Sequence, residues 1–273
     1  MFKIFDLHND YYLKFNTDKK RNDYLKNSSE NIYNVVSAVW TSELNATDSF
    51  KAIKDARDFV NLNKQLFLGV EDLHFLSKNR LDEFYLFRPL YAGLTWNNTN
   101  CLAGGAHESG KLTSFGKQVV KGLENSGTKV DCAHLNEESF MDLSKITSNS
   151  ILCSHTACYG VNQHPRNLKD YQIKMLVDSG GLFGLCLVSD FLNGEKHCKV
   201  SDIIAHIDYF ACKFGINNLA IGTDFNGTNH LPQKIKSYSQ LINELSSSLM
   251  KLGYTEKSLN KIFYENAYNF FQK

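Results

Sequence analysis

Two residues near the start of the chain are of types that bind metal ions. Residues 6–10 read Asp6-Leu7-His8-Asn9-Asp10, which places an imidazole and a carboxylate at the end of a short apolar run. In a β-strand, residues two apart point to the same face and lie about 6–7 Å from each other. A nitrogen and an oxygen ligand on one face make half of a site for zinc or a harder divalent ion. Alone, this pair is weak evidence, because most such pairs are ordinary surface residues.

The same residue types stand at the ends of other apolar runs. They are Glu71 after 66–70, His134 after 129–133, His155 after 151–154 and Asp224 after 219–223. In a parallel α/β barrel the carboxyl ends of the strands meet on one rim, so we expect all six groups to converge. Titratable groups gathered in this way need mutual neutralisation, and a pair of divalent ions supplies it.

We therefore predict a binuclear metal centre. By residue type, His8 and Asp10 bind one ion, His134 and His155 bind the other, and Glu71 bridges the two. Two ions about 3.5–4 Å apart can share a water molecule, lower its pKa and polarise a carbonyl group. Imidazole with carboxylate favours zinc, although other divalent ions accept the same ligands.

The apolar pattern predicts strands alternating with helices along the whole chain. The expected strands are 3–8, 33–40, 66–71, 90–96, 129–134, 151–155, 182–188 and 219–224, and the expected helices are 114–125, 137–146, 168–178, 201–214, 237–252 and 255–271. Asn136 and Asn167 are read as residues that open helices, and 75–87 as a loop with a short helix. Eight such units without a linker predict a single domain over 1–273, folded as a (β/α)8 TIM barrel, with an open doubly wound sheet as the alternative.

The composition favours a soluble protein that acts on small molecules. Thirty basic and 29 acidic side chains give a net charge of +1, which argues against nucleic acid or a membrane surface as partner. Seven cysteines show no CxxC spacing, so we expect free thiols. Because no signal peptide precedes the first strand and no apolar run could span a bilayer, we expect a cytoplasmic location.

Seven short motifs together resemble a known family. They are DLHND (6–10), GVE (69–71), LTSFG (112–116), VDCAH (130–134), SHTA (154–157), HPRNL (164–168) and GTDFNG (222–227). The family is the membrane dipeptidase (renal dipeptidase) family, peptidase family M19, whose members are binuclear zinc enzymes with an amidohydrolase-like barrel. The resemblance extends over nearly the whole chain.

The resemblance implies hydrolysis of dipeptides with a free C-terminal carboxylate by a hydroxide that bridges the metals. It implies two Zn²⁺ ions held by the five ligands named above, and a homodimer. Arg166 would bind the substrate carboxylate, as suits a planar guanidinium. Asp224 would act as the acid–base group that passes a proton to the leaving amine.

The chain departs from the family pattern at two places. Founding members have a substrate-binding histidine after the fourth strand, where this chain has Trp96 followed by Asn97. Trp96 and Asn97 are therefore candidates for substrate binding, and Asn97 or a metal ion could take the role of the missing histidine. The bridging Glu71 is followed by Asp72 where the family usually has glycine, and this charge could alter metal affinity or face solvent.

Other functions remain open at this stage. The departure at Trp96 leaves room for a related amidase or lactamase that acts on another small amide. A non-catalytic metal-binding barrel, and a metal-free glycosidase using Glu71 and Asp224, are further alternatives. His107 lies in a glycine-rich loop without a phosphate-binding pattern and is read as part of a mobile loop, and His164, before Pro165, is read as a turn residue. His230 is set aside because it does not end a predicted strand.

Overall fold

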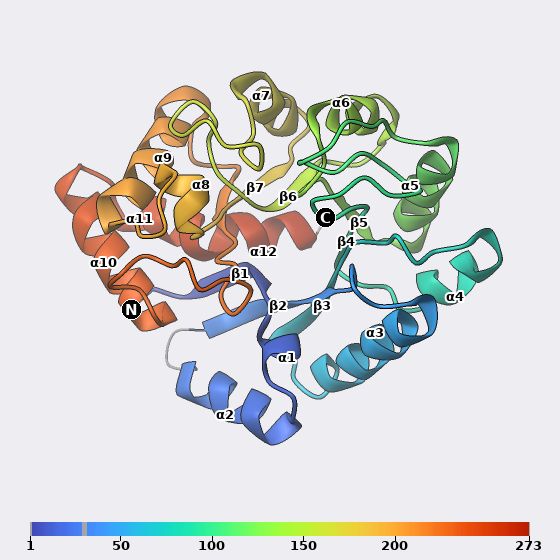
Figure 1. Cartoon of the computed structure of the whole chain (residues 1–273). Helices are drawn as coiled ribbons and strands as arrows, with labels where there is room; N and C mark the ends of the chain where they lie inside the picture. The colour runs from blue at the N-terminus through green and yellow to red at the C-terminus, as the bar shows by residue number, and fades with distance from the viewer. Residues whose placement is uncertain (1, 29–31, 273) are drawn as a thin grey trace.

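Eight parallel strands close into a barrel in the computed structural model, which describes residues 2–28 and 32–272 (Figure 1). The order around the barrel is the order along the chain, β1 to β8. The strands are β1 Ile4–Asn9, β2 Ile32–Trp40, β3 Leu66–Glu71, β4 Tyr91–Gly93, β5 Lys129–Asp131, β6 Leu152–Thr156, β7 Leu182–Leu185 and β8 Leu219–Ile221. The predicted TIM barrel is confirmed and the open sheet is excluded.

Helices surround the barrel and connect consecutive strands (Figure 1). They are α1 Tyr11–Lys14, α2 Asp18–Ser28, α3 Ala46–Val60, η1 Lys78–Arg80, α4 Leu81–Tyr85, α5 Ser114–Ser126, α6 Glu137–Ile146, α7 Asp170–Asp178, α8 Ser189–Asn193, α9 Val200–Phe214, α10 Tyr238–Lys251, α11 Glu256–Asn260, the π-helical η2 Lys261–Glu265 and α12 Asn266–Phe271. Within the described ranges, none of them combines the length and hydrophobicity that crossing a bilayer requires.

One end of the barrel is filled by apolar side chains, which leaves the other end for chemistry. Phe5 and Tyr91 from the strands form a cluster with Ala267 and Phe270 of α12, and all four are at most 5% exposed. Burying each of the two phenylalanines contributes about 1.5–3 kcal/mol. At the opposite end, β2 and β3 pair residue for residue up to Trp40 and Glu71, which therefore reach the rim at the same level.

Several strands are shorter than predicted at their carboxyl ends. The runs expected to reach Trp96, His134, Val188 and Asp224 leave the ladder at Gly93, Asp131, Leu185 and Ile221. The physical reason is a change of backbone direction above the rim, because His134 and Asp224 adopt left-handed conformations with φ of 67° and 59°. Apolar composition continues through these turns because the loops pack on the barrel, so the pattern alone does not mark where pairing stops.

The predicted helices are present, but two of them differ from the prediction and one further helix was missed. Asn167 does not open a helix; α7 begins at Asp170, and the Asn167 amide instead donates to the backbone carbonyls of Asn162 and Phe191. The last predicted helix is interrupted by the π-helical segment η2. Helix α3 was not predicted, although Asn45 caps it by accepting from the Asp48 backbone amide.

Candidate metal centre

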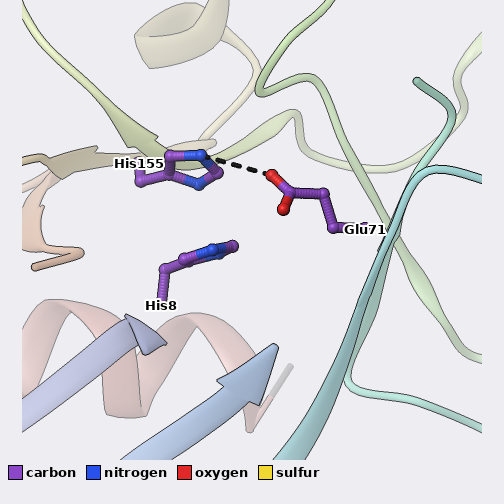
Figure 2. A group of neighbouring side chains, drawn as sticks. All are labelled: His8, Glu71 and His155. Carbon is purple, nitrogen blue, oxygen red and sulfur yellow. Dashed lines mark ion pairs between the residues drawn. The ribbon is translucent and has the colours of Figure 1, made fainter. Parts of the chain in front are cut away.

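The predicted ligands converge at the carboxyl end of the barrel, as Figure 2 shows for three of them. Glu71 ends β3 and His155 lies within β6, while His134 follows β5 in its left-handed turn. His8 lies in β1, but Asp10 stands beyond the strand at the first position before α1. The His8 and Asp10 side chains therefore meet through a turn, not through the alternation of a strand.

The donor atoms lie within a few ångströms of one another. Glu71 Oε1 is 2.7 Å from His134 Nε2 and 3.5 Å from His155 Nε2, and these two nitrogens are 2.9 Å apart. His8 Nε2 lies 3.5 Å from Asp10 Oδ2. Among the described residues, two groups have ligand atoms within 4.8 Å of each other: His8 with Glu71 and His155, and His8 with Asp10 and Asp224. His8 thus belongs to both groups, and Asp224 joins the second.

The Nδ1 atom of His8 is held by a buried tyrosine. Tyr91 donates its hydroxyl to the Leu7 carbonyl at 3.0 Å, and the same oxygen lies 2.8 Å from His8 Nδ1. Because the hydroxyl proton is already used, we infer that His8 Nδ1 carries a proton and donates it to Tyr91. Nε2 of His8, which lies near the donor atoms of Glu71 and His155, is then the nitrogen that a metal ion can bind.

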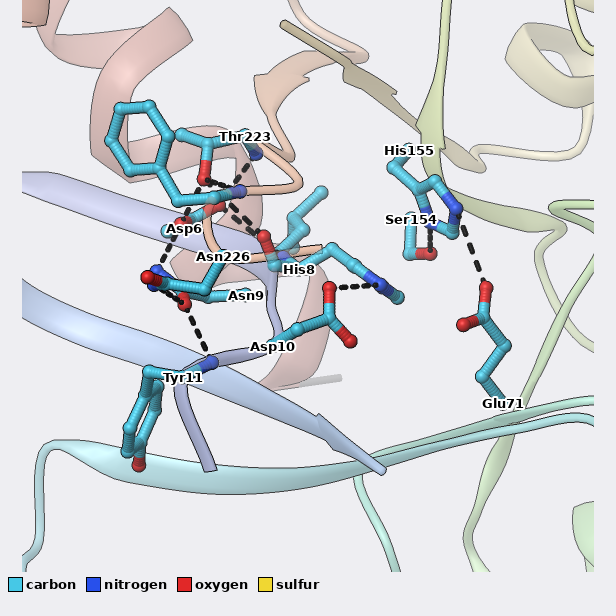
Figure 3. Close-up of polar contacts among 12 residues, drawn as sticks. Asp6, His8, Asn9, Asp10, Tyr11, Glu71, Ser154, His155, Thr223 and Asn226 are labelled. Carbon is cyan, nitrogen blue, oxygen red and sulfur yellow. Dashed lines mark hydrogen bonds and ion pairs between the residues drawn. The ribbon is translucent and has the colours of Figure 1, made fainter. Parts of the chain in front are cut away.

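The other two histidines are oriented in the same way. Ser154 donates its hydroxyl to the Asp131 carboxylate and lies 2.8 Å from His155 Nδ1, so it accepts the proton of that nitrogen (Figure 3 shows the Ser154–His155 contact). His134 Nδ1 lies 2.9 Å from the amide oxygen of Asn97, which can only accept. His134 and His155 therefore present an unprotonated Nε2, and Nε2 of His8 is the nitrogen left for a metal ion, the arrangement that metal-binding histidines have when a neighbour holds their other nitrogen.

This set of atoms fits a divalent cation. Lone pairs on His134 and His155 face each other and a carboxylate oxygen. Arg166 donates to His155 Nε2, whereas Glu71 Oε1 is buried without a hydrogen-bond donor. Acceptors packed against acceptors repel unless a cation lies between them. Imidazole nitrogens and carboxylate oxygens are ligands that zinc accepts, and manganese or cobalt bind similar sets.

Burial and mutual charge shift the pKa values of the ligands. Burial holds the pKa values of His134 and His155 well below the usual range, and Arg166 and His8 add to this effect. Burial also lowers the pKa of His8, but Asp10, Glu71 and Asp224 outweigh it and raise the pKa to about 10. Burial raises the pKa of Glu71, against the attraction of His8 and Arg166. Each of these shifts results from packing charged and polar groups into one dry site.

Asp224 lies against the site, on a turn whose backbone packs closely against the end of β1. Its amide donates to the His8 carbonyl at 3.0 Å, which joins the end of β8 to β1. A Cβ on Gly227 would overlap Asp10 Oδ2 and Asp224 Oδ1, so a larger residue here would displace these two carboxylates. Burial and the neighbouring charge of Asp10 raise the pKa of Asp224 well above the usual range, which suits a group that holds a proton.

The three predicted substrate-binding residues lie beside the ligands. Arg166 is buried, and its Nη2 donates to His155 Nε2 at 2.8 Å. Asn97 contacts His134 as described above, so it positions a ligand as well as lining the cavity. The Trp96 ring centroid is 6.0 Å from that of His134.

Two buried carboxylates that were not predicted hold the strand ends together. Asp6 accepts from the backbone amides of His8 and Thr223 at 3.3 and 2.8 Å and from the Thr223 hydroxyl, which joins β1 to the turn after β8 (Figure 3). Asp131 accepts from the backbone amide and hydroxyl of Ser154, which joins β5 to β6. Each precedes a ligand by two or three residues, a spacing that could have singled them out.

Residues that were set aside also surround the cavity. His107, His164 and His230 line it, the last paired with Asp190 at 2.6 Å. They reach it on loops, which is why the ends of predicted strands did not reveal them. Asp72 does not face solvent: it is 6% exposed, and its carboxylate accepts from Ser42, Asn100 and the His74 amide.

Comparisons with known proteins identify the family of the chain. The family model described as membrane dipeptidase (peptidase family M19) matches residues 19–273. An uncharacterised protein from the pqqA 5′ region of Klebsiella pneumoniae is 28% identical over 201 residues, which is 68% of this chain and 72% of that protein.

Two solved structures have the same fold. One is a metallopeptidase from Rhodobacter sphaeroides bound to a phosphinate mimic of the dipeptide L-Ala-D-Ala, with 18% identity, a TM-score of 0.85 and coverage of 100% of this chain and 99% of that one. The other is a metallopeptidase described as dipeptidase AC of family M19, with 18% identity, a TM-score of 0.86 and coverage of 99% and 98%.

Proposed function

This chain belongs to the membrane dipeptidase family of metallopeptidases, and from that premise we propose that it hydrolyses dipeptides with a free C-terminal carboxylate by means of two Zn²⁺ ions. The observation that carries the proposal is the convergence of the Nε2 atoms of His8, His134 and His155 on the Glu71 carboxylate, whose Oε1 is buried without a hydrogen-bond donor. The dipeptide mimic bound by the Rhodobacter sphaeroides relative supports the substrate class.

We assign the metal ligands as His8, Asp10, Glu71, His134 and His155, with Glu71 shared between the two ions. When bound, the two ions would activate a water molecule and stabilise negative charge that develops on the substrate carbonyl oxygen. The lone-pair arrangement described above supports this assignment. His8 and Glu71 are both largely shielded from solvent.

Asp224 and Arg166 would perform the remaining steps. Asp224 has a raised pKa and stands next to Asp10, so it can take a proton from the attacking water and deliver it to the leaving amine. Arg166 would hold the substrate carboxylate through its guanidinium group, because one of its nitrogens already lies beside the ligand His155. That contact would keep the substrate within reach of the metals.

The first experiment measures metal content and hydrolysis together. We expect purified protein to take up two zinc ions per chain and to cleave Ala-Ala. Glu71→Gln should abolish cleavage while the barrel remains folded, since the bridging charge is lost and the shape is kept. A fully metallated and active Glu71→Gln protein would contradict the assignment.

A second experiment tests Arg166 by the substrate carboxylate. Wild-type protein should prefer Ala-Ala over Ala-Ala amide, and Arg166→Met should reduce this preference by about 10–100-fold, the effect of losing a hydrogen bond to a charged group. Arg88→Met is the control: Arg88 is exposed and precedes β4, at the opposite end of the barrel. Preference for blocked C-termini in the wild type would favour the other candidate, an amidase acting on a different amide, which the presence of Trp96 motivates.

A further inference from the structure

We propose that the site prefers dipeptides whose amino-terminal residue has a bulky apolar side chain, and that this side chain packs against Trp40 and Trp96. The proposal rests on the dipeptidase function above and adds the substrate class to it. It concerns a surface of the cavity that takes no part in binding metal.

The cavity above the ligands has chemically different walls. It holds about 710 Å³ and opens at the carboxyl end of the barrel. Leu13, Trp40 and Trp96 form an apolar wall over β1, β2 and β4, and Leu13 is 39% exposed. The side over β8 is polar, lined by Asp224 and Asn226.

The two tryptophans form one surface beside the metal ligands. Their ring centroids are 5.2 Å apart at an interplanar angle of 62°, an edge-to-face pair in which each ring supports the other. Trp40 pairs in register with Glu71, and the Trp96 ring stands 6.0 Å from the His134 ring. Both side chains are only partly buried, so part of each indole is open to the cavity.

The direction of a bound dipeptide follows from Arg166. Arg166 follows β6, and its guanidinium touches His155 at 2.8 Å and lies 5.3 Å from the Phe191 ring. A carboxylate held there is one residue, at most about 3.6 Å of chain, from the scissile carbonyl over the ligands. The amino-terminal residue must therefore lie beyond the ligands, on the side away from β6.

Trp40 occupies that side, and the Trp96 ring, which follows β4, lies against it with 5.2 Å between the ring centroids. In a closed barrel of eight strands, β2 is four strands from β6 and therefore faces it, and β2 ends in Trp40. The Cα of the amino-terminal residue carries an ammonium group and a side chain. The ammonium group would turn to the carboxylates of Asp10 and Asp224, which leaves the side chain to face the tryptophans.

The wall should discriminate by side-chain size. A well-formed apolar contact changes kcat/KM by about tenfold or more for each methylene-sized difference, and an open wall lies at the low end of that range. We expect Phe-Ala to exceed Gly-Ala in kcat/KM by at least about tenfold. Ala-Phe and Ala-Gly should differ by much less, because their varied side chain lies on the Arg166 side.

Binding can be observed without turnover, because Trp40 and Trp96 are the only two tryptophans of the chain. The zinc-loaded protein is titrated with phosphinate analogues of Phe-Ala, Gly-Ala and Ala-Phe while tryptophan emission is recorded. The Phe-Ala analogue should bind at least about tenfold more tightly than the Gly-Ala analogue and change the emission most. Equal affinity, or a larger emission change with the Ala-Phe analogue, overturns the proposal.

Variants locate the effect. Trp96→Ala and Trp40→Ala should each reduce the ratio of kcat/KM for Phe-Ala over Gly-Ala by about tenfold, mainly through Phe-Ala. Phe191→Ala is the matched control, since this aromatic ring lines the same cavity beside Arg166 and should leave that ratio unchanged. A ratio that persists in both tryptophan variants contradicts the proposal.

These outcomes distinguish a failure of the proposed dipeptidase function from a failure of the proposed side-chain preference. If no dipeptide is cleaved, the proposed function fails. If Gly-Ala is cleaved as fast as Phe-Ala, the function stands and only the side-chain preference is wrong. If a tryptophan variant does not fold, the emission titration of the wild type still decides.

Discussion

Replacing Tyr91 by phenylalanine removes one oxygen atom that holds a metal ligand from behind. The hydroxyl lies 2.8 Å from His8 Nδ1 and donates to the Leu7 carbonyl at 3.0 Å. Burial raises the pKa of Tyr91 well above the usual range, so the hydroxyl keeps its proton at neutral pH. The ring itself can stay in place, because it packs closely over Gly69, where a Cβ would lie 2.7 Å away.

The loss should appear first in zinc affinity. A neighbour that orients a metal-binding histidine contributes about 10–100-fold to metal affinity, or about 1.4–2.7 kcal/mol. The metal-free protein should also lose about 1–3 kcal/mol of unfolding free energy, because His8 Nδ1 and the Leu7 carbonyl remain buried without a partner. Water cannot replace the hydroxyl easily, since Tyr91 is fully buried.

The assay is a zinc titration against a competing chelator, combined with urea unfolding of the metal-free protein. Tyr85→Phe is the matched control: its hydroxyl is also buried but has no hydrogen-bond partner, and it lies against Gly122 of α5, away from the ligands. Tyr85→Phe should leave zinc affinity unchanged. If Tyr91→Phe binds zinc within twofold of the wild type, the inferred proton on His8 Nδ1 is wrong. The inference that His8 offers its Nε2 to a metal ion would then have no basis.

Three further results are expected. Gly227→Ala should lower activity by about a hundredfold in a folded protein, because its Cβ would displace the carboxylates of Asp10 and Asp224; wild-type activity would contradict the close approach. Removing zinc with a chelator should cost about 2.7 kcal/mol of stability relative to zinc at a hundred times its Kd, and an unchanged Tm would argue against a site formed by the folded barrel. Burial lowers the pKa of His206 below its unfolded value of 6.5, so the unfolded chain binds the proton first. The free energy of unfolding should therefore decrease as the pH is lowered beneath about 6.5, by up to about 1.4 kcal/mol per pH unit. Above that pH this group should have no effect on stability. His206→Gln should have a shallower urea-unfolding profile against pH, and identical slopes would refute this.

Strand composition predicted eight parallel strands with helices between them, because such strands are apolar on both faces, but closure of the barrel over an open sheet was decided by the structure. Composition was not enough to locate the strand ends. His134 and Asp224 leave their strands through left-handed turns that neither residue type requires. Such conformations cost about 1–3 kcal/mol each and persist because the surrounding contacts impose them. The local hydrophobic pattern of the sequence does not predict those tertiary contacts.

The residue types determined which chemistry the chain can perform. Histidines and carboxylates placed after apolar runs predict a metal centre in any barrel, because closure brings the strand ends to one rim. The tertiary structure alone decided how these groups face one another. The nitrogen of each histidine that keeps its proton depends on Tyr91, Ser154 and Asn97, which are 83, 1 and 37 residues from their partners. The same holds for the tryptophan wall: Trp40 and Trp96 are distant in sequence and meet because β2 and β4 both flank β3 in the barrel.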